Sequence, residues 1–333
     1  MPSIRNARGG VNHARRKLLR AVFSSAPAML LAAPLRDVIA ADDATAAAAA
    51  AQAEGEISVQ RQYVNGPYGQ VHLRTWAPTD PARATATPLL CLHPTPFSGA
   101  FFDEFAALLA TDRIVLCPDT PGYGGSSRPP SPVSVADYAG AIASLLRATG
   151  YGRGGRGGVD VLGFHTGAAI AAELGIGNPD LAQRLVLAGL PYFTDPDEQR
   201  AELEMRAREK PYTHDPQRLG DAWLDYYRRH ADRAERGRLQ ALFAEQLRAG
   251  DEAWWAYRAV FTWPGGERLA RIRQQVLLIA TGETLYRHTV DALPLLADAE
   301  LVEHPEFGAP VFQHHHEAMA GIVRGWTAQL CRC

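Results

Sequence analysis

Short apolar segments recur along this chain, and stretches with helical spacing separate most of them. Strands are predicted at 57–64, 70–76, 89–93, 114–117, 159–163, 185–188, 276–280 and 300–303. Helices are predicted at 100–110, 135–149, 167–175 and 315–330. Short buried strands that alternate with helices are typical of a mostly parallel sheet covered on both faces. The sequence therefore predicts an α/β fold with a mostly parallel, eight-stranded sheet.

The interval 195–266 interrupts this alternation. It is rich in Arg, Glu and Ala, contains no strand-like run, and carries aromatic residues at spacings near three and four: Trp223, Tyr226, Tyr227, Trp254, Trp255, Tyr257, Phe261 and Trp263. We expect a helical cap at 191–266, inserted into a core formed by 57–190 and 267–333. Most of the aromatic side chains should pack the cap against the core. The others should face a cleft that suits an apolar or aromatic ligand.

The first forty residues are predicted to direct export. The segment 15–20 begins with two arginines and resembles the twin-arginine motif, and the uncharged run 21–35 that follows is too short to span a bilayer. Small residues before Ala41 predict cleavage after Ala40, with an Ala-rich linker at 41–56. A periplasmic or secreted protein without stable membrane insertion is therefore expected. The alternative is a basic tail on a cytosolic protein.

Charge and cysteine content argue against two other classes of protein, nucleic-acid-binding proteins and disulfide scaffolds. Lys and Arg number 34 against 36 for Asp and Glu, and a net charge of -2 gives no electrostatic reason to expect a nucleic-acid partner. Four cysteines in 333 residues do not make a disulfide scaffold, and Cys91 and Cys117 end two predicted strands as expected buried thiols. The glycine run at 152–157 matches a dinucleotide-binding pattern, but a predicted helix precedes it and a strand follows. It is therefore interpreted as a surface loop.

The segment 159–167 reads Val-Asp-Val-Leu-Gly-Phe-His-Thr-Gly, which predicts a strand, a tight turn and a helix. It resembles the nucleophile elbow of the α/β-hydrolase superfamily. In that turn, glycines flank the apex because the backbone is strained and neighbouring chain passes close by. Here Gly163 and Gly167 flank the apex, and the apex residue is His165, where the superfamily usually has serine.

Two further segments support the resemblance, which extends over about 57–330. The segment 90–96 is similar to the superfamily's His-Gly-x-Pro loop, and 119–127 is similar to its Asp-x-Pro-Gly-x-Gly-x-Ser turn. The resemblance implies that the backbone amides of Thr95 and Thr166 form an oxyanion hole. It also implies that His93 is a buried structural residue.

The remaining positions of the usual catalytic triad depart from the superfamily. Leu285 stands where the carboxylate belongs, with Glu283 as the nearest substitute, and Ala309 stands where the histidine belongs. The triplet 314–316 supplies other histidines close by in sequence. An imidazole is largely neutral at pH 7 and can attack an acyl carbon or deprotonate water without a second histidine. A histidine apex thus makes the usual carboxylate and the usual histidine of the triad dispensable. The same substitutions also fit an active site that has lost its function.

These residues predict a hydrolase of an apolar ester or lactone, in which His165 is nucleophile or general base and Glu283 is the candidate acidic residue. The sequence leaves open whether Glu283 or a histidine of the triplet 314–316 contacts His165. We expect the substrate to contact Phe97, Tyr123, Phe164, Trp254 and Tyr257. No cofactor is predicted, and no metal, because the histidines lack ligand spacing. One alternative is a cofactor-free lyase or isomerase with His165 as base. Another is a ligand-binding protein that keeps the fold without catalysis. The sequence does not indicate an oligomeric state.

Overall fold

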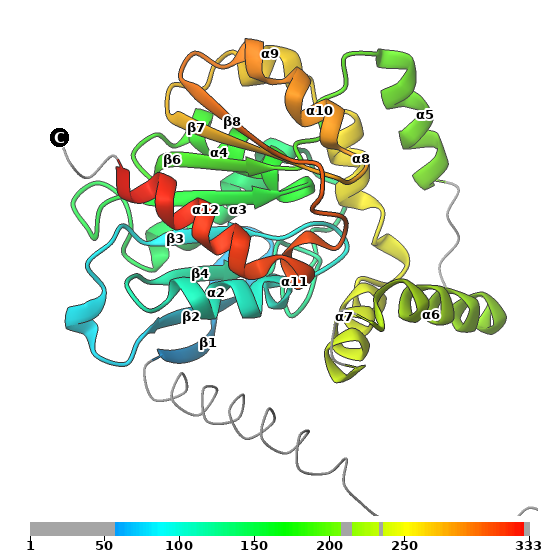
Figure 1. Ribbon diagram of the computed structural model, residues 1–333, viewed down its shortest axis with the longest axis horizontal. Coiled ribbons are helices and arrows are strands. Elements are labelled where there is room, and N and C mark those ends of the chain that lie inside the picture. Colours follow the sequence, from blue (N-terminus) through cyan, green and yellow to red (C-terminus); the bar gives the residue numbers. More distant parts are fainter. Residues whose placement is uncertain (1–56, 208–214, 233–235, 330–333) are drawn as a thin grey trace, which may run out of the picture. The chain divides into compact units, whose positions relative to one another are not determined.

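The central sheet runs in the order β1-β2-β4-β3-β5-β6-β7-β8 (Figure 1). The computed structural model describes residues 57–207, 215–232 and 236–329. Within them the strands are β1 (Ile57–Gly66), β2 (Gly69–Pro78), β3 (Leu89–Leu92), β4 (Val115–Pro118), β5 (Val159–Phe164), β6 (Ala182–Ala188), β7 (Gln275–Thr281) and β8 (Ala299–His304). The predicted mostly parallel, eight-stranded sheet is confirmed.

One strand, β2, runs against the others, because it is antiparallel to both of its neighbours. β1 and β2 form an antiparallel hairpin, and β2 is also antiparallel to β4. The remaining neighbours pair in parallel, from β4 through β3, β5, β6 and β7 to β8. The carboxyl ends of these parallel strands therefore meet at one edge of the sheet, which is where open α/β sheets bind ligands.

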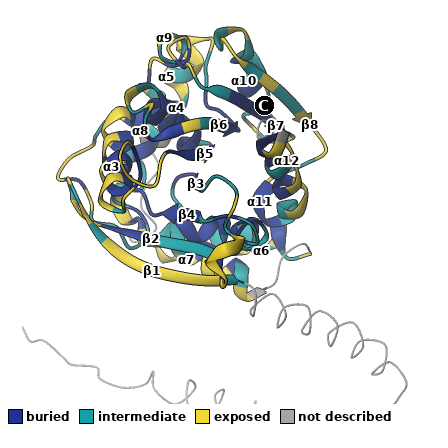
Figure 2. Cartoon of the chain, turned by 90° about the vertical axis from the view of Figure 1, so that its left-hand side faces the viewer, coloured by how far each residue is buried: buried dark blue, intermediate teal, exposed yellow. Residues whose placement is uncertain are grey.

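Helices cover both faces of the sheet. The helices α2 (Asp103–Leu109), α11 (Val311–His314) and α12 (His316–Gln329) pack together on one face, and α3 (Val135–Ala148) and α4 (Thr166–Gly177) pack together on the other. Strand β3 serves both cores, because Leu89 and Cys91 join one hydrophobic cluster and Leu90 and Leu92 join the other. Figure 2 shows the result: the central strands are buried and β1 is exposed.

Local signals explain several element boundaries. Ser134 caps α3 in a capping box with Asp137, and Asp215 caps α6 (Pro216–His230) by accepting hydrogen bonds from the next turn. The predicted helix at 100–110 begins as a 3₁₀ turn, and the one at 315–330 corresponds to α12, which the separate short helix α11 precedes. Further 3₁₀ turns lie at Pro81–Arg83, Gly250–Glu252 and Leu293–Leu295. The helix α10 (Tyr286–Asp291) was not predicted, because it is short and carries no apolar periodicity.

Between β6 and β7 the described residues form helices and loops and no strand. The helices are α5 (Pro196–Ala207), α6 (Pro216–His230), α7 (Arg236–Arg248), α8 (Trp255–Phe261) and α9 (Gly265–Leu269). Arg238 of α7 bonds to the carbonyl of Ala100 and the carboxylate of Glu104. The buried carboxylate of Glu173, on α4, accepts from Trp263 and Arg268 at 2.6 to 2.7 Å. The insertion is thus tied to both faces of the core.

Further sequence predictions concern the cysteines, the amino-terminal segment, the glycine run and membrane insertion. Cys91 and Cys117 are buried free thiols, as predicted. The predicted export signal at 1–40, the linker at 41–56 and the last two cysteines lie outside the described residues. The glycine run at 152–157 is a turn between α3 and β5. None of the described helices is long and apolar enough to cross a membrane.

Candidate active site

His165 occupies a strained turn between β5 and α4. Its φ of 51° makes it the single non-glycine residue with positive φ among the described residues. The flanking glycines are required by close packing: a Cβ on Gly163 would lie 2.2 Å from the carbonyl oxygen of Gly167, and one on Gly167 would lie 1.9 Å from that of Leu92. Such a backbone costs about 1–3 kcal/mol and persists where the surrounding structure fixes it. The fold therefore holds the apex side chain in one place.

The imidazole of His165 is paired with the carboxylate of Glu283. Its Nε2 atom lies 2.9 Å from Oε2 of Glu283, which follows β7 by two residues. The side chain of His165 is 31% exposed and that of Glu283 is 2% exposed. Gly189, just after β6, makes room for the pair, because a Cβ there would lie 2.6 Å from Cδ2 of His165 and 2.8 Å from Oε1 of Glu283.

The surroundings of Glu283 favour its ionised form. Burial raises the pKa of this carboxyl. The charge of His165 and hydrogen bonds from His165, from the amide of Leu285 and from the hydroxyl of Thr284 together lower the pKa by more than burial raises it. The net pKa is therefore below its usual range. An ionised carboxylate only accepts hydrogen bonds, so Nε2 of His165 must carry the proton that it shares with Glu283. The lone pair of the neutral ring is then on Nδ1.

A cavity of about 650 Å³ lies at the carboxyl ends of the strands beneath the inserted helices. Its walls come from the loops after β3, β5, β6, β7 and β8 and from α5 to α8. His165 lines the cavity with Thr95 and Thr166, whereas Glu283 lies behind His165 and is not part of the lining. The exposed edge of the imidazole therefore faces the space in which a ligand of moderate size fits.

The two residues expected to supply oxyanion donors are both buried in the cavity wall. Thr166 begins α4, so its amide has no acceptor within the helix, and the helix dipole favours negative charge there. Thr95 lies opposite in the loop after β3, and its carbonyl accepts a hydrogen bond of 2.8 Å from the hydroxyl of Tyr257. The described structure thus brings Thr95, Thr166 and His165 to one cavity.

His93 has the structural role implied by the sequence. It is 1% exposed, its Nδ1 donates to the carbonyl of Pro94, and its Nε2 accepts from the amide of Thr120 at 2.9 Å. Burial lowers the pKa of this imidazole, which keeps it neutral. It fixes the loop that carries Thr95 and takes no place in the cavity lining.

The predicted aromatic contacts divide into two groups. Phe97, Phe164 and Tyr257 line the cavity, and the ring of Phe164 lies 4.0 Å from that of His165. Tyr123 and Trp254 do not line it. The hydroxyl of Tyr123 is buried against the start of α8, where it bonds to the carbonyl of Ala253 and the amide of Ala256.

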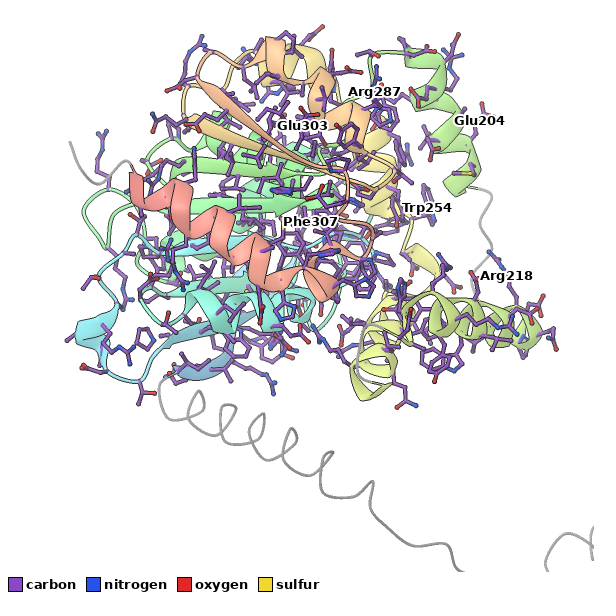
Figure 3. The ribbon with its side chains drawn as sticks, viewed as in Figure 1. Glu204, Arg218, Trp254, Arg287, Glu303 and Phe307 are labelled. Atoms are coloured by element: carbon purple, nitrogen blue, oxygen red, sulfur yellow. The ribbon has the colours of Figure 1, made fainter. Side chains whose placement is uncertain are left out.

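Trp254 lies at the first residue before α8 (Figure 3). The structure thus places Tyr123 and Trp254 outside the cavity lining, unlike Phe97, Phe164 and Tyr257. The apolar members that sequence reasoning missed are Phe101, Pro191, Phe193, Val260 and Pro310.

The two positions that usually carry the acid and the histidine of a triad line the same cavity, but apolar residues occupy them here. Leu285 and Ala309 both lie in the wall. The nearby histidines are engaged elsewhere: the ring of His315 stacks on Phe307 at 4.4 Å, and the ring of His314 lies 5.6 Å from that of His230. Phe307 lies in the loop after β8 (Figure 3). The hydrogen-bond partner of His165 is therefore Glu283 and not a residue of the histidine triplet.

Comparison with known proteins places this fold in a family. A model of the Alpha/beta hydrolase family matches residues 89–322. The chain belongs to the Alpha/beta hydrolase family. No curated protein matches the sequence. Membership of the Alpha/beta hydrolase family supports an enzyme of the hydrolase class.

Solved structures show the same fold at low sequence identity. A hydrolase from Pseudomonas aeruginosa PA01 is 20% identical, with a TM-score of 0.64, over 79% of this chain and 97% of that one. A thermophilic esterase from Thermogutta terrifontis is 17% identical, with a TM-score of 0.62, over 81% and 98%. The enol-lactonase from Burkholderia xenovorans LB400 is 16% identical, with a TM-score of 0.63, over 80% and 100%.

Within 57–207, 215–232 and 236–329, no group of three histidine, cysteine or acidic residues is arranged to hold a metal ion.

Proposed function

We propose that this member of the Alpha/beta hydrolase family hydrolyses an ester or lactone with an apolar body, and that His165 acts where other members use serine. The observation that carries the proposal is the hydrogen bond between Nε2 of His165 and buried Glu283, at an elbow that opens into the cavity. It orients the imidazole as a carboxylate orients the histidine of a serine hydrolase. A ring held in this way supports general-base or nucleophilic chemistry at Nδ1.

In the general-base route, Nδ1 of His165 takes a proton from water while the water oxygen bonds to the acyl carbon. The amides of Thr95 and Thr166 donate hydrogen bonds to the oxygen that becomes negative. When the carbon–oxygen bond to the leaving group breaks, Nδ1 returns the proton to the departing oxygen. Glu283 remains ionised throughout and stabilises the imidazolium.

In the nucleophilic route, Nδ1 bonds directly to the acyl carbon and the alkoxide leaves, taking a proton from solvent. Water then attacks the acyl-imidazole, which releases the acid and restores the ring. Hydroxylamine separates the two routes, because it intercepts an acyl-imidazole as a hydroxamate. Hydroxamate formation at the expense of acid indicates the nucleophilic route, and unchanged acid release indicates the general-base route.

The cavity wall supports an apolar or aromatic substrate body, because many of its lining residues are aromatic or proline, among them Phe97, Phe164 and Pro191. The names of two structural neighbours, an esterase and an enol-lactonase, agree with an ester or lactone as the bond that is cleaved.

The first experiment compares hydrolysis of an activated aryl ester by wild type and by His165→Ala between about pH 5 and pH 9. His304→Ala is the matched control, because accessible histidines cleave such esters slowly and His304 is a partly exposed histidine outside the cavity lining. Wild type and control should turn over, with a rate that rises as an imidazole loses its proton, and His165→Ala should not. Equal low rates in all three would overturn the proposal and direct the search to carbon-acid substrates.

Export remains a separate proposal, supported by the sequence at 15–40 alone. Replacement of Arg15 and Arg16 by lysine should leave the protein in the cytoplasm of a host with a twin-arginine system, whereas wild type should be exported and begin near Ala41. Amino-terminal sequencing of the fractionated proteins tests both statements.

A further inference from the structure

Tyr257 of the inserted helix α8 bonds to the loop after β3 that carries Thr95. Its hydroxyl donates a hydrogen bond of 2.8 Å to the carbonyl of Thr95, from which it is separated by 162 positions in the sequence. Both residues line the cavity. The sequence predicts Tyr257 only as a substrate contact, whereas the structure gives its hydroxyl a partner within the chain. That partner belongs to a residue proposed to stabilise the oxyanion.

Thr95 is held on both sides of its Cα atom. On the amino side, the carbonyl of Pro94 accepts hydrogen bonds from Nδ1 of His93 and from the amide of Phe97, each at 3.0 Å. On the carboxyl side, the carbonyl of Thr95 itself accepts from Tyr257. The amide of Thr95 belongs to the first of these two planar peptide groups. Because both planes meet at Cα of Thr95, a bond that holds the second plane also limits rotation of the first.

The amide of Thr95 is open to a ligand oxygen. Thr95 is 6% exposed, and no backbone carbonyl of the described residues accepts a hydrogen bond from its amide. Buried backbone donors are nearly always paired in folded proteins, so an open N–H in a cavity wall suits a ligand acceptor. Such a donor stabilises developing charge best when it already points at the oxygen before the reaction begins. The direction of this amide therefore matters for catalysis.

The start of α8 is fixed to the core independently of Tyr257. The hydroxyl of Tyr123 donates to the carbonyl of Ala253 at 3.0 Å and accepts from the amide of Ala256 at 3.1 Å. The ring of Tyr257 also stacks on that of Phe261, with centroids 6.3 Å apart and an interplanar angle of 10°. These contacts do not involve the hydroxyl of Tyr257. Removal of that hydroxyl alone should therefore leave the helix in place.

We propose that Tyr257 positions the amide of Thr95 for the oxyanion, so that the oxyanion hole is complete only while α8 lies against the loop after β3. This inference rests on the proposed function and deepens it, because it gives the inserted helices a part in the geometry of the site as well as in enclosing the cavity. Tyr257 acts through Thr95 and is a positioning residue.

The first test measures kcat and KM of Tyr257→Phe with the aryl ester. We expect kcat to fall by about tenfold while KM stays within about twofold, because the oxyanion hole acts on the transition state. Tyr286→Phe is the matched control, since its hydroxyl also makes a hydrogen bond, to Glu303, and Tyr286 lies outside the cavity lining. It should match wild type. Equal kcat in the two variants, or a rise in KM with unchanged kcat, would overturn the inference.

A thiono ester provides a readout that general damage to the cavity would not produce. Sulfur in place of the carbonyl oxygen is a weak hydrogen-bond acceptor, so this substrate gains little from the two amides. Tyr257→Phe should therefore lose about tenfold in kcat with the oxygen ester and less than about twofold with the thiono ester. An equal loss with both esters would show a general disturbance of the cavity and would contradict a role in positioning Thr95.

Calorimetry separates the inference from the proposed function. The probes are an aryl trifluoromethyl ketone, which is a tetrahedral hydrate in water, and the corresponding planar methyl ketone. Wild type should bind the hydrate about tenfold more tightly than the methyl ketone, and Tyr257→Phe should lose most of that preference. If no ester is hydrolysed but this preference depends on Tyr257, the positioning role stands and the hydrolase proposal fails. If esters are hydrolysed and Tyr257→Phe equals Tyr286→Phe in both assays, the hydrolase proposal stands and the positioning role fails.

Discussion

Gly189 lies directly against the imidazole of His165, so that a methyl group in place of its hydrogen would come within 2.6 Å of Cδ2. The same carbon would lie 2.8 Å from Oε1 of Glu283. The end of β6 therefore forms the back wall of the paired side chains and fixes how far the ring can retreat from the cavity.

Gly189→Ala should displace the pair. With a φ of +54°, the new side chain also meets backbone strain of about 1–2 kcal/mol. We expect kcat for the aryl ester to fall by about 10²-fold, since a shift of the reacting group by one ångström has an effect of that order. Gly140→Ala is the control, because a Cβ there meets nothing within 4 Å. It should stabilise α3 by about 0.5–1 kcal/mol and leave kcat unchanged. Equal kcat in the two variants would contradict the described geometry.

Glu283→Gln should remove the carboxylate that holds the proton on Nε2. An amide can donate to Nε2 and so favour the tautomer with its proton on Nδ1, and we expect kcat to fall by about 10²- to 10⁴-fold. Glu300→Gln, at an exposed position on β8, is the control and should match wild type. A Glu283→Gln variant with wild-type kcat would show that Glu283 has no part in the chemistry.

The same carboxylate should make stability depend on pH. Because interactions in the folded state lower the pKa of Glu283 below its ordinary value of 4.5, its contribution is fully present above that value. The contribution is lost as the pH falls through the lowered folded-state pKa. Urea titrations of wild type and Glu283→Gln should therefore give a difference in unfolding free energy that is constant near neutrality and shrinks in acid. A difference that grows in acid would contradict the direction of the shift.

Asp103 should show the opposite dependence. Burial raises the pKa of this carboxyl to about 6, although Arg74 and Arg238 act against the rise. The folded state holds the proton more tightly than the unfolded state, so this group lowers stability as the pH rises from 3.8 through about 6. Asp103→Asn should raise the unfolding free energy at pH 7 by about 1–2 kcal/mol, and by much less below about pH 4. Thermal unfolding at both pH values checks this, and a variant less stable at pH 7 would contradict it.

The carboxylate of Glu173 should stabilise the packing of the inserted helices against α4, the helix that follows His165. It is 4% exposed and is held by Trp263 and by two nitrogens of Arg268. Arg268→Met leaves a buried charge with one partner, and we expect a loss of about 2–3 kcal/mol, at the lower end of the range because Arg268 is partly exposed. Glu173→Gln combined with Arg268→Met should recover part of that loss in urea unfolding. Additive effects of the two changes would show that the charges do not interact.

Much of the fold and the centre of the site could be predicted because local rules determine them. The alternation of apolar runs and helices fixed the sheet, and the glycines around His165 indicated a turn that only glycine tolerates. Parallel strands bring their carboxyl ends to one edge, so a carboxylate just after β7 was the natural candidate to reach a residue just after β5.

The cavity wall could not be predicted in the same way. Tyr123 bonds to the backbone near Ala253 across 130 residues of sequence, and nothing at either position records that pairing. Gln313 lines the cavity, where its side chain donates a hydrogen bond to the carbonyl of Phe101 on a 3₁₀ turn that is distant in sequence. Helical spacing shows which aromatic residues share a face, but only the packing of the helix decides whether that face looks into the cavity or into the core.

The ring of His165 is held on three sides, by Glu283 at Nε2, by Phe164 on one face, and by Gly189 beside Cδ2. Nδ1 is bonded to Cγ, next to the main chain, and moves only if χ1 or χ2 turns. A serine hydroxyl can swing toward an incoming carbonyl, but this nitrogen stays where the turn puts it. The substrate must therefore make the approach, and branching beside its carbonyl should slow the reaction more than length at its far end.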